Sequence, residues 1–229
     1  MPVNKAVERR VARLYPVLKA HFGFQHWWPG ETRFEIVVGA LLTQNCAWSN
    51  VEKAIGSLKN AGVLSLGALR ELPRERLEAL IRPTGYFRQK AERLERLLSF
   101  LADDLGWDGV SPIRRDTMRF RRELLSLSGI GPETADSILC YGFDRKVFVV
   151  DAYTRRVLSR LPVAVTDDYE TIRALFERAI GEELGGSLDA FKDLHAQIVM
   201  LGKHYCKKSV PLCEGCPLFT ARSCHRRHR

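Results

Sequence analysis

The chain has 229 residues, with 36 Lys or Arg against 27 Asp or Glu, so its formal charge at pH 7 is +9, and 45% of its residues are hydrophobic. A chain of this length buries roughly 70% of the surface that its unfolded form exposes, which excludes a disordered tail and a small fold held by disulfides. The longest apolar stretch, Ile36 to Leu42, is far shorter than the ~20 residues of a membrane helix, and no apolar signal region follows the N-terminus. We expect a cytoplasmic protein that is not secreted and has no membrane partner.

Apolar residues recur at the helix period along most of the chain. The clearest case is Lys90 to Leu105, where Ala and Leu fall on one face and Glu and Arg, including Arg93, fall on the other. The predicted helices span residues 7–19, 34–42, 51–58, 74–81, 90–105, 117–126, 134–142, 151–159, 169–180 and 188–202. The only strand-like run, Lys146 to Val150, is too short to build a sheet, so we predict an all-α fold.

Two aromatic segments lie near the N-terminus. The first is His26-Trp27-Trp28-Pro29, and the second runs from Leu42 to Glu52 and contains Gln44 and Trp48. Large aromatic side chains either fill a core or form the walls of a binding pocket. We expect Trp27 to pack in the core, whereas the residues alone leave both roles open for Trp28 and Trp48.

A glycine hairpin joins two predicted helices at Leu127-Ser128-Gly129-Ile130-Gly131-Pro132. Gly129 and Gly131 permit backbone angles closed to other residues and leave their amides accessible, with Ile130 packing inward. Such a turn can bind an anion, for example a DNA phosphate, without reading sequence. An ordinary tight turn between helices is the alternative, and the excess positive charge favours the phosphate site.

Asp151 directly follows the apolar run Phe148-Val149-Val150 and precedes a predicted helix. Its carboxylate is therefore expected to cap the N-terminus of that helix. Capping by itself would give Asp151 no further role.

Four of the six cysteines crowd the C-terminal end of the chain: Cys206, Cys213, Cys216 and Cys224. Their spacing leaves six, two and seven intervening residues, and it indicates metal ligation in a reducing compartment rather than disulfides. Zinc sites with four thiolates generally use two Cys-x-x-Cys pairs, and only one is present here. Cys46 and Cys140 lie in apolar helical contexts and are expected to be buried thiols.

The pattern Leu-x-Gly-x-Gly, followed after about twenty residues by Val150-Asp151, resembles the helix-hairpin-helix DNA glycosylases of the endonuclease III superfamily. The resemblance implies two helical domains that flank a DNA groove. One is a six-helix barrel with the hairpin, at residues 26–143, and the other is a discontinuous domain at 1–25 and 144–229 that carries an iron-sulfur loop. It also implies that Asp151 is catalytic, because hydrolysis of an N-glycosidic bond builds positive charge on the sugar and a sheltered carboxylate stabilises it.

The chain departs from the bifunctional members of this superfamily at Glu133. Those members carry a lysine two residues after the second glycine, and it attacks the sugar to form an imine that a carboxylate cannot form. Lys203 and Lys207 do not match the position of this nucleophile. We therefore predict a monofunctional glycosylase that releases a base with water, has no lyase activity, and has Glu133 near the base pocket.

The aromatic segments resemble the subgroup that excises alkylated purines, the 3-methyladenine DNA glycosylase III type. In that subgroup the residues at the positions of Trp28 and Trp48 sandwich the flipped base, and an alkylated purine offers both a π-face and positive charge to aromatic walls. By the same resemblance, Gln44 fills the gap in the duplex and Tyr86 is the intercalating wedge. Neighbouring cations, Arg82, Arg88 and Lys90, would face phosphate.

The cysteine spacing resembles the [4Fe-4S] loop of the superfamily, in which six, two and five residues intervene. The last gap is two residues longer here, which makes Cys224 the least regular of the four expected ligands. Four thiolates suit such a cluster, and its expected role is to hold a basic loop with Lys207 and Lys208 against DNA. Members of the alkylpurine subgroup do not all carry this cluster.

The hypothesis is a monomeric base-excision repair glycosylase that acts on alkylated purines in double-stranded DNA with damaged bases and is associated with the nucleoid in a bacterium or archaeon. One alternative is an endonuclease III-like glycosylase and abasic-site lyase for oxidised pyrimidines. Another is a non-catalytic iron-sulfur module for DNA binding or redox. The excess positive charge suits all three, because it attracts phosphate independently of sequence.

Overall fold

The computed structural model describes residues 5–224, and helices make up its regular structure. Over this range no β-strand forms, which confirms the all-α prediction, and Lys146 to Val150 is extended without pairing. No helix in the described part of the chain is long and apolar enough to cross a membrane.

The chain divides into two compact units. The barrel unit, as we call it, is Trp28–Arg145, and the terminal unit consists of the chain before Trp28 and from Lys146 on. The barrel unit contains the helices α3 (Arg33–Leu42), α4 (Trp48–Asn60), α5 (Leu66–Glu71), α6 (Arg74–Ile81), η1 (Arg82–Thr84), α7 (Phe87–Ser99), η2 (Phe100–Asp104), α8 (Thr117–Ser126), α9 (Pro132–Ser137) and η3 (Ile138–Gly142).

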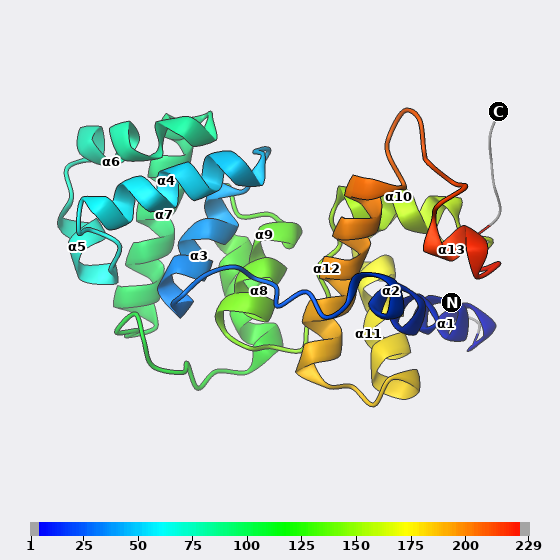
Figure 1. Cartoon of the computed structure of the whole chain (residues 1–229). Helices are drawn as coiled ribbons and strands as arrows, with labels where there is room; N and C mark the ends of the chain where they lie inside the picture. Colours follow the sequence, from blue (N-terminus) through cyan, green and yellow to red (C-terminus); the bar gives the residue numbers. More distant parts are fainter. Residues whose placement is uncertain (1–4, 225–229) are drawn as a thin grey trace. The chain divides into compact units, whose positions relative to one another are not determined.

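Helix α3 forms the centre of the barrel unit. Its N-cap is Thr32, whose hydroxyl accepts a hydrogen bond from the Glu35 amide at 3.1 Å. Nearly every side of α3 is buried, because it packs against α4, α7, α9 and η3 (Figure 1). The apolar run Ile36 to Leu42 is therefore a core helix, and its C-terminal end carries the loop with Gln44.

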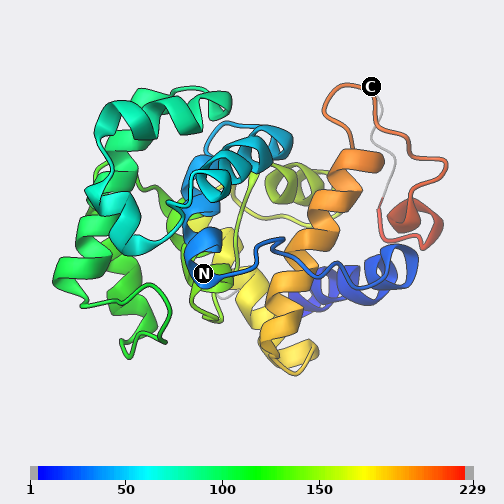
Figure 2. The ribbon, with the colours of Figure 1, turned by 60° about the vertical axis from the view of Figure 1, so that its left-hand side comes forward.

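The terminal unit is built around α12. Its helices are α1 (Lys5–Ala12), α2 (Leu14–Phe22), α10 (Ala152–Arg160), α11 (Tyr169–Glu183), α12 (Leu188–His204) and α13 (Pro217–Thr220). Helix α12 packs against α2, α10 and α11, and its contact with α2 can be followed in both views (Figure 1 and Figure 2). The two ends of the chain are thus joined in one unit.

Several helix boundaries differ from the predicted ones. The helix predicted over 7–19 breaks at Arg13, and Pro16 explains part of this, because it has no N–H to donate to the carbonyl of Ala12. The helices predicted over 90–105 and 134–142 both end in π-helical turns, at η2 and η3. The short helices α5 and α13 were not predicted, since six and four residues are too few for a clear period.

Candidate active site

Asp151 caps the N-terminus of α10, as its position in the sequence predicts. One carboxylate oxygen accepts a hydrogen bond from the Thr154 amide at 2.7 Å. The preceding residues, Val147 to Val150, are almost fully buried, and the Phe148 ring stacks on Phe176 at 4.2 Å. This anchored run fixes the backbone that carries Asp151, whose side chain is only 12% exposed.

His195 of α12 lies beside Asp151, with its Nε2 3.5 Å from the Asp151 Oδ2, and it is itself buried. Burial by itself raises the pKa of Asp151, but the interactions with His195 and the hydrogen bond from the Thr154 amide outweigh it, so that the pKa is lowered from the usual value of an aspartate. Asp151 is therefore a carboxylate at neutral pH. His195 could not be predicted from the sequence, because a single histidine on an amphipathic helix gives no distinguishing signal.

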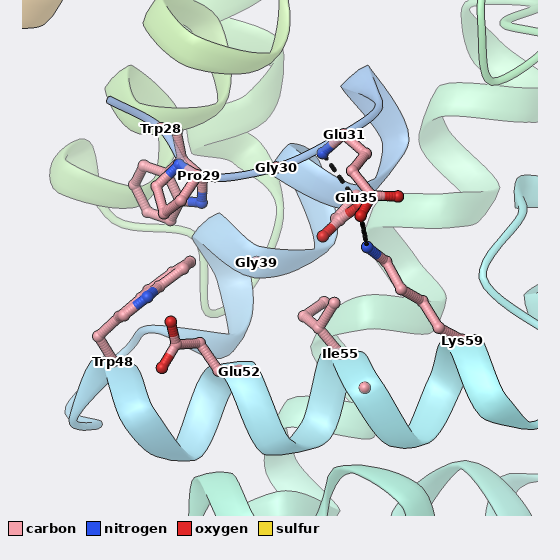
Figure 3. A pocket seen from close by; sticks show the side chains of 11 residues that line it. Trp28, Pro29, Gly30, Glu31, Glu35, Gly39, Trp48, Glu52, Ile55 and Lys59 are labelled. Atoms are coloured by element: carbon pink, nitrogen blue, oxygen red, sulfur yellow. Dashed lines mark hydrogen bonds and ion pairs between the residues drawn. The ribbon is translucent and has the colours of Figure 1, made fainter. Parts of the chain in front are cut away.

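A cavity of about 430 Å³ opens in the barrel unit between α3, α4 and the segment that precedes α3. Its lining residues are Trp28, Pro29, Gly30, Glu31, Glu35, Gly39, Trp48, Glu52, Ile55, Gly56 and Lys59. Figure 3 shows Trp48 and Glu52 one turn apart on α4, both pointing toward the side of the cavity where Trp28 lies. This cavity, which we call the aromatic pocket, thus contains both tryptophans expected to contact a base.

The two indole rings lie edge to face, with centroids 5.3 Å apart and planes at 85°. A base stacked between parallel rings needs a ring separation of about 7 Å, twice a van der Waals contact. The rings must therefore rotate before they can sandwich a base. Trp28 also packs on Tyr141 at 5.3 Å and lies over Gly39, where a Cβ would be 3.3 Å from the indole nitrogen.

The aromatic pocket is acidic although the protein as a whole is basic. Lys59, the only cation among the lining residues, lies 2.9 Å from Glu31 and 3.0 Å from Glu35. Glu52 makes no ion pair within residues 5–224, so its charge near Trp48 is not neutralised by the protein. Glu133 is exposed at the start of α9 and does not line this pocket.

Gln44 is hydrogen-bonded to the glycine hairpin. Its side-chain amide donates to the Gly129 carbonyl at 3.0 Å and to the Thr134 hydroxyl at 2.9 Å, and its side-chain oxygen accepts from Arg93 at 2.7 Å. Tyr86, in contrast, is 68% exposed and has a left-handed backbone with φ 45°. Tyr86 is thus already in position to project, whereas Gln44 must exchange these bonds before it can enter a duplex.

The two hairpin glycines have different requirements. Gly129 has φ +88°, and a Cβ there would lie 2.6 Å from the Cδ of Arg93, so only glycine fits. Gly131 has φ −90° and open space around it, so the expectation that both glycines adopt special angles is wrong for Gly131. Ile130 is buried as predicted, and among the described residues neither glycine amide donates to a protein acceptor.

Lys90 does not face solvent, and the expectation that it contacts phosphate is wrong. It is 1% exposed, and its ammonium group donates to the carbonyls of Leu42 and Thr84, each at 2.8 Å. Arg82 and Arg88 are exposed, and both guanidinium groups lie within 6 Å of the Phe87 ring. The helix period could not separate Lys90 from these surface cations, because all three border the same turn.

The four clustered cysteines influence one another electrostatically. Burial and the neighbouring thiols Cys216, Cys206 and Cys213 raise the pKa of Cys224 to about 11. Arg160 connects the ends of the loop, since its guanidinium donates to Cys206 Sγ at 3.1 Å and its carbonyl accepts from Cys224 Sγ at 3.4 Å. Even so, no group of three or more Cys, His, Asp or Glu in residues 5–224 is arranged to hold a single metal ion.

The other lysines, cysteines and tryptophan singled out in the sequence differ in exposure. Lys207 and Lys208 are exposed, and their carbonyls accept hydrogen bonds from Arg160 at 2.9 and 3.2 Å. Cys140 is buried as expected, but Cys46 is only half-buried, because the loop that follows α3 leaves its sulfur near the surface. Trp27 is half-buried, with the Lys203 ammonium 5.7 Å from its ring.

Comparison with known proteins decides the family. Residues 38–182 match the model of the HhH-GPD superfamily of base excision DNA repair proteins. The chain belongs to this superfamily. The match spans α3 to α11 and includes the glycine hairpin and Asp151, and it confirms the resemblance seen in the sequence.

Three relatives illustrate how the glycosylase compares with known members. A protein of Methanocaldococcus jannaschii named as a DNA repair glycosylase is 42% identical over 210 residues, which cover 91% of this chain and 93% of that one. The structure of Helicobacter pylori 3-methyladenine DNA glycosylase bound to 1,N6-ethenoadenine superposes with a TM-score of 0.73 at 29% identity, covering 85% and 97% of the two chains. The structure of a non-covalent endonuclease III–DNA complex superposes with a TM-score of 0.74 at 25% identity, covering 93% of this chain and 92% of that one.

These findings establish a base-excision DNA glycosylase whose partner is DNA. The matched residues include α8, the glycine hairpin and α9. Both a 3-methyladenine DNA glycosylase and endonuclease III are similar to this chain.

Proposed function

We propose that the glycosylase hydrolyses the N-glycosidic bond of alkylated purines, such as 3-methyladenine, and leaves an abasic site. The observation that carries this proposal is the aromatic pocket, in which two indole rings and the carboxylate of Glu52 lie together. Purines alkylated on a ring nitrogen carry positive charge, and aromatic faces next to a carboxylate attract cations. The likeness to an H. pylori 3-methyladenine glycosylase supports the same substrate class.

Asp151 is the proposed catalytic residue. As the sugar becomes cationic during bond cleavage, a carboxylate that is held ionised at low exposure stabilises it or orients the attacking water. The hydrogen bond from the Thr154 amide and the neighbouring His195 keep the carboxylate in one orientation. An alkylated base is a good leaving group, so this chemistry does not require a strong general acid.

DNA binding is assigned to the barrel unit and to the cysteine loop. The accessible amides of Gly129 and Gly131 would bind a phosphate, Tyr86 would intercalate, and Gln44 would fill the gap left by the extruded nucleotide. Lys207 and Lys208 would add phosphate contacts from the terminal unit. We also propose that the two units correspond to the six-helix barrel domain and the iron-sulfur domain of the family, and that the enzyme acts as a monomer.

The proposed cofactor is a [4Fe-4S] cluster held by Cys206, Cys213, Cys216 and Cys224. The donor set fits, because four thiols lie in one short segment, and the other three are near enough to Cys224 to raise its pKa. Four thiolates suit a cluster, which is larger than a single ion. When bound, the cluster would cross-link the loop. The chain itself supplies Arg160, which holds both ends of the cysteine segment.

An excision assay over duplexes with alkylated, oxidised, deaminated and mismatched bases tests the substrate class. We expect release of alkylated purines, and preferential release of oxidised pyrimidines would instead favour the endonuclease III-like alternative. Borohydride trapping with abasic DNA tests the monofunctional mechanism. No covalent adduct is expected, because Glu133 stands where bifunctional members have their lysine, and an adduct would contradict this part of the proposal.

A further inference from the structure

Lys90 carries a positively charged group that is buried away from solvent. It is 1% exposed and is among the largest fully buried side chains of the protein. Burying an ammonium group is unfavourable unless hydrogen bonds replace its hydration, and here two backbone carbonyls do so at 2.8 Å each. The two hydrogen bonds therefore offset part of the cost of removing the ammonium group from water.

Both carbonyls belong to the last residues of helices. Leu42 ends α3 and Thr84 ends η1, and no backbone amide in the described part of the chain donates to either oxygen. Carbonyls at helix C-termini lack intrahelical partners and carry partial negative charge, so a cation is favourable there. A single ammonium group therefore caps two helices whose ends are 42 residues apart in sequence.

The residues proposed to enter the duplex follow these two caps at the same distance. Gln44 lies two residues after Leu42, and Tyr86 lies two residues after Thr84. The segment that leads to Tyr86 has an unusual backbone, since Gly85 and Tyr86 both have positive φ, at 65° and 45°. Each proposed DNA-inserting residue is thus attached by a short segment to a carbonyl that Lys90 holds.

We propose that Lys90 is a positioning residue that sets the separation of Gln44 and Tyr86 for nucleotide extrusion. This inference rests on the proposed function of those two residues as gap filler and wedge. An inserted side chain separates stacked bases only if the loop that carries it is not itself displaced. A rigid connection between the two inserted residues therefore lowers the barrier to nucleotide extrusion.

Arg93 extends the same arrangement by one turn of α7. Its guanidinium donates to the side-chain oxygen of Gln44 at 2.7 Å, and its aliphatic part lies where a Cβ on Gly129 would be. Lys90 and Arg93 occupy positions i and i+3, so they lie on one face of α7. This face connects the Tyr86 loop, the Gln44 loop and the glycine hairpin within the barrel unit.

The test compares Lys90→Met with Lys53→Met in the full-length protein. Methionine has a similar length but donates no hydrogen bond. Lys53 is an exposed lysine of α4, so its substitution removes the same charge and leaves the hydrogen bonds of Lys90 in place. Single-turnover base release is measured for a lesion in a fully paired duplex and for the same lesion in an unpaired bulge. We expect Lys90→Met to slow base release from the paired duplex on the order of tenfold and from the bulged duplex less than about twofold. Lys53→Met should change neither rate by more than about twofold.

A double-mutant cycle with Tyr86→Ala separates positioning from general destabilisation. If Lys90 acts through the wedge, Lys90→Met adds little to the defect of Tyr86→Ala, whereas equal and additive slowing of both substrates would overturn the proposal. Should Lys90→Met fail to fold, Arg93→Met, at a half-buried position, is expected to give the same selective loss. Wild-type rates for Tyr86→Ala and Gln44→Ala would refute the wedge itself, and wild-type rates for Lys90→Met alone would refute only the role of Lys90.

Discussion

The barrel unit and the terminal unit hold their proposed functional side chains in different ways. In the barrel unit, Lys90, Gln44 and Arg93 form hydrogen bonds between segments that are far apart in sequence. In the terminal unit, Asp151 is held by the amide of its own helix and one histidine. The difference indicates that the barrel unit fixes the spacing of several loops, whereas the terminal unit fixes one carboxylate.

This comparison predicts that variants of the barrel unit change DNA engagement and base selection, and that variants of the terminal unit change the chemical step or the stability of the cysteine loop.

Asp151→Asn should abolish most base release. Losing the carboxylate removes the stabilisation of the developing cation, and we expect a rate loss of at least about 10²- to 10³-fold. Asparagine still caps a helix N-terminus, so folding and affinity for lesion-containing duplex should be retained. Single-turnover excision and equilibrium binding check this. Wild-type excision with retained binding would place the catalytic group elsewhere.

Cys213→Ser should remove the proposed cluster. We expect loss of visible absorbance and of about four iron atoms per chain, with a free energy of unfolding lowered by several kcal/mol because the loop is no longer cross-linked. The matched control is Cys46→Ser, a half-buried thiol outside the group of four, which should retain iron. A colourless wild-type protein with stoichiometric zinc would refute the iron-sulfur assignment.

Gly129→Ala and Gly131→Ala form a pair that tests the hairpin. Alanine at 129 requires a left-handed backbone and displaces Arg93, so we expect a stability loss of about 1–3 kcal/mol and weaker DNA binding at unchanged chemistry. Alanine at 131 meets open space at φ −90° and should leave the free energy of unfolding unchanged within about 0.5 kcal/mol. Chemical denaturation and duplex binding measure both, and equal losses at the two positions would contradict the structure.

Glu52→Gln should reduce the preference of the enzyme for cationic over neutral bases. The carboxylate lies in the aromatic pocket without an ion-pair partner in the described chain, so removing its charge should weaken excision of a cationic alkylpurine about fivefold. A neutral purine lesion is the internal control, and its rate should not change. An equal effect on both substrates would show that Glu52 acts through the shape of the pocket and not through its own charge.

The pH dependence of excision tests the environment of Asp151. Its pKa is lowered from the usual value of an aspartate, so the group stays ionised as pH falls from neutrality. Its catalytic role and its contribution to stability are therefore lost only as pH falls through this lowered pKa. His195→Gln removes the neighbour that opposes the effect of burial, which should raise the pKa of Asp151 and shift the acid limb of the rate profile to higher pH. An unchanged acid limb in that variant would contradict the pairing.

The sequence predicted the main helices, because amphipathic periods survive any arrangement of the core, and it located the hairpin and the capping role of Asp151. It could not distinguish Lys90 and Arg93 from surface cations, since a period reports which face a residue occupies but not which carbonyl or side chain it meets. Similarly, Gly131 and Gly129 look equivalent in sequence, and only the backbone angles separate them.

The chemistry expected of this protein was thus determined by the sequence itself: a carboxylate at 151, four clustered thiols, and a glutamate at 133 where an attacking lysine would be. The tertiary structure decided which groups act on one another. It brought His195 next to Asp151, placed Glu52 on the side of the aromatic pocket where Trp28 and Trp48 lie, and placed one lysine between two helix ends. These are contacts between residues distant along the chain, and they depend on packing that local sequence does not encode.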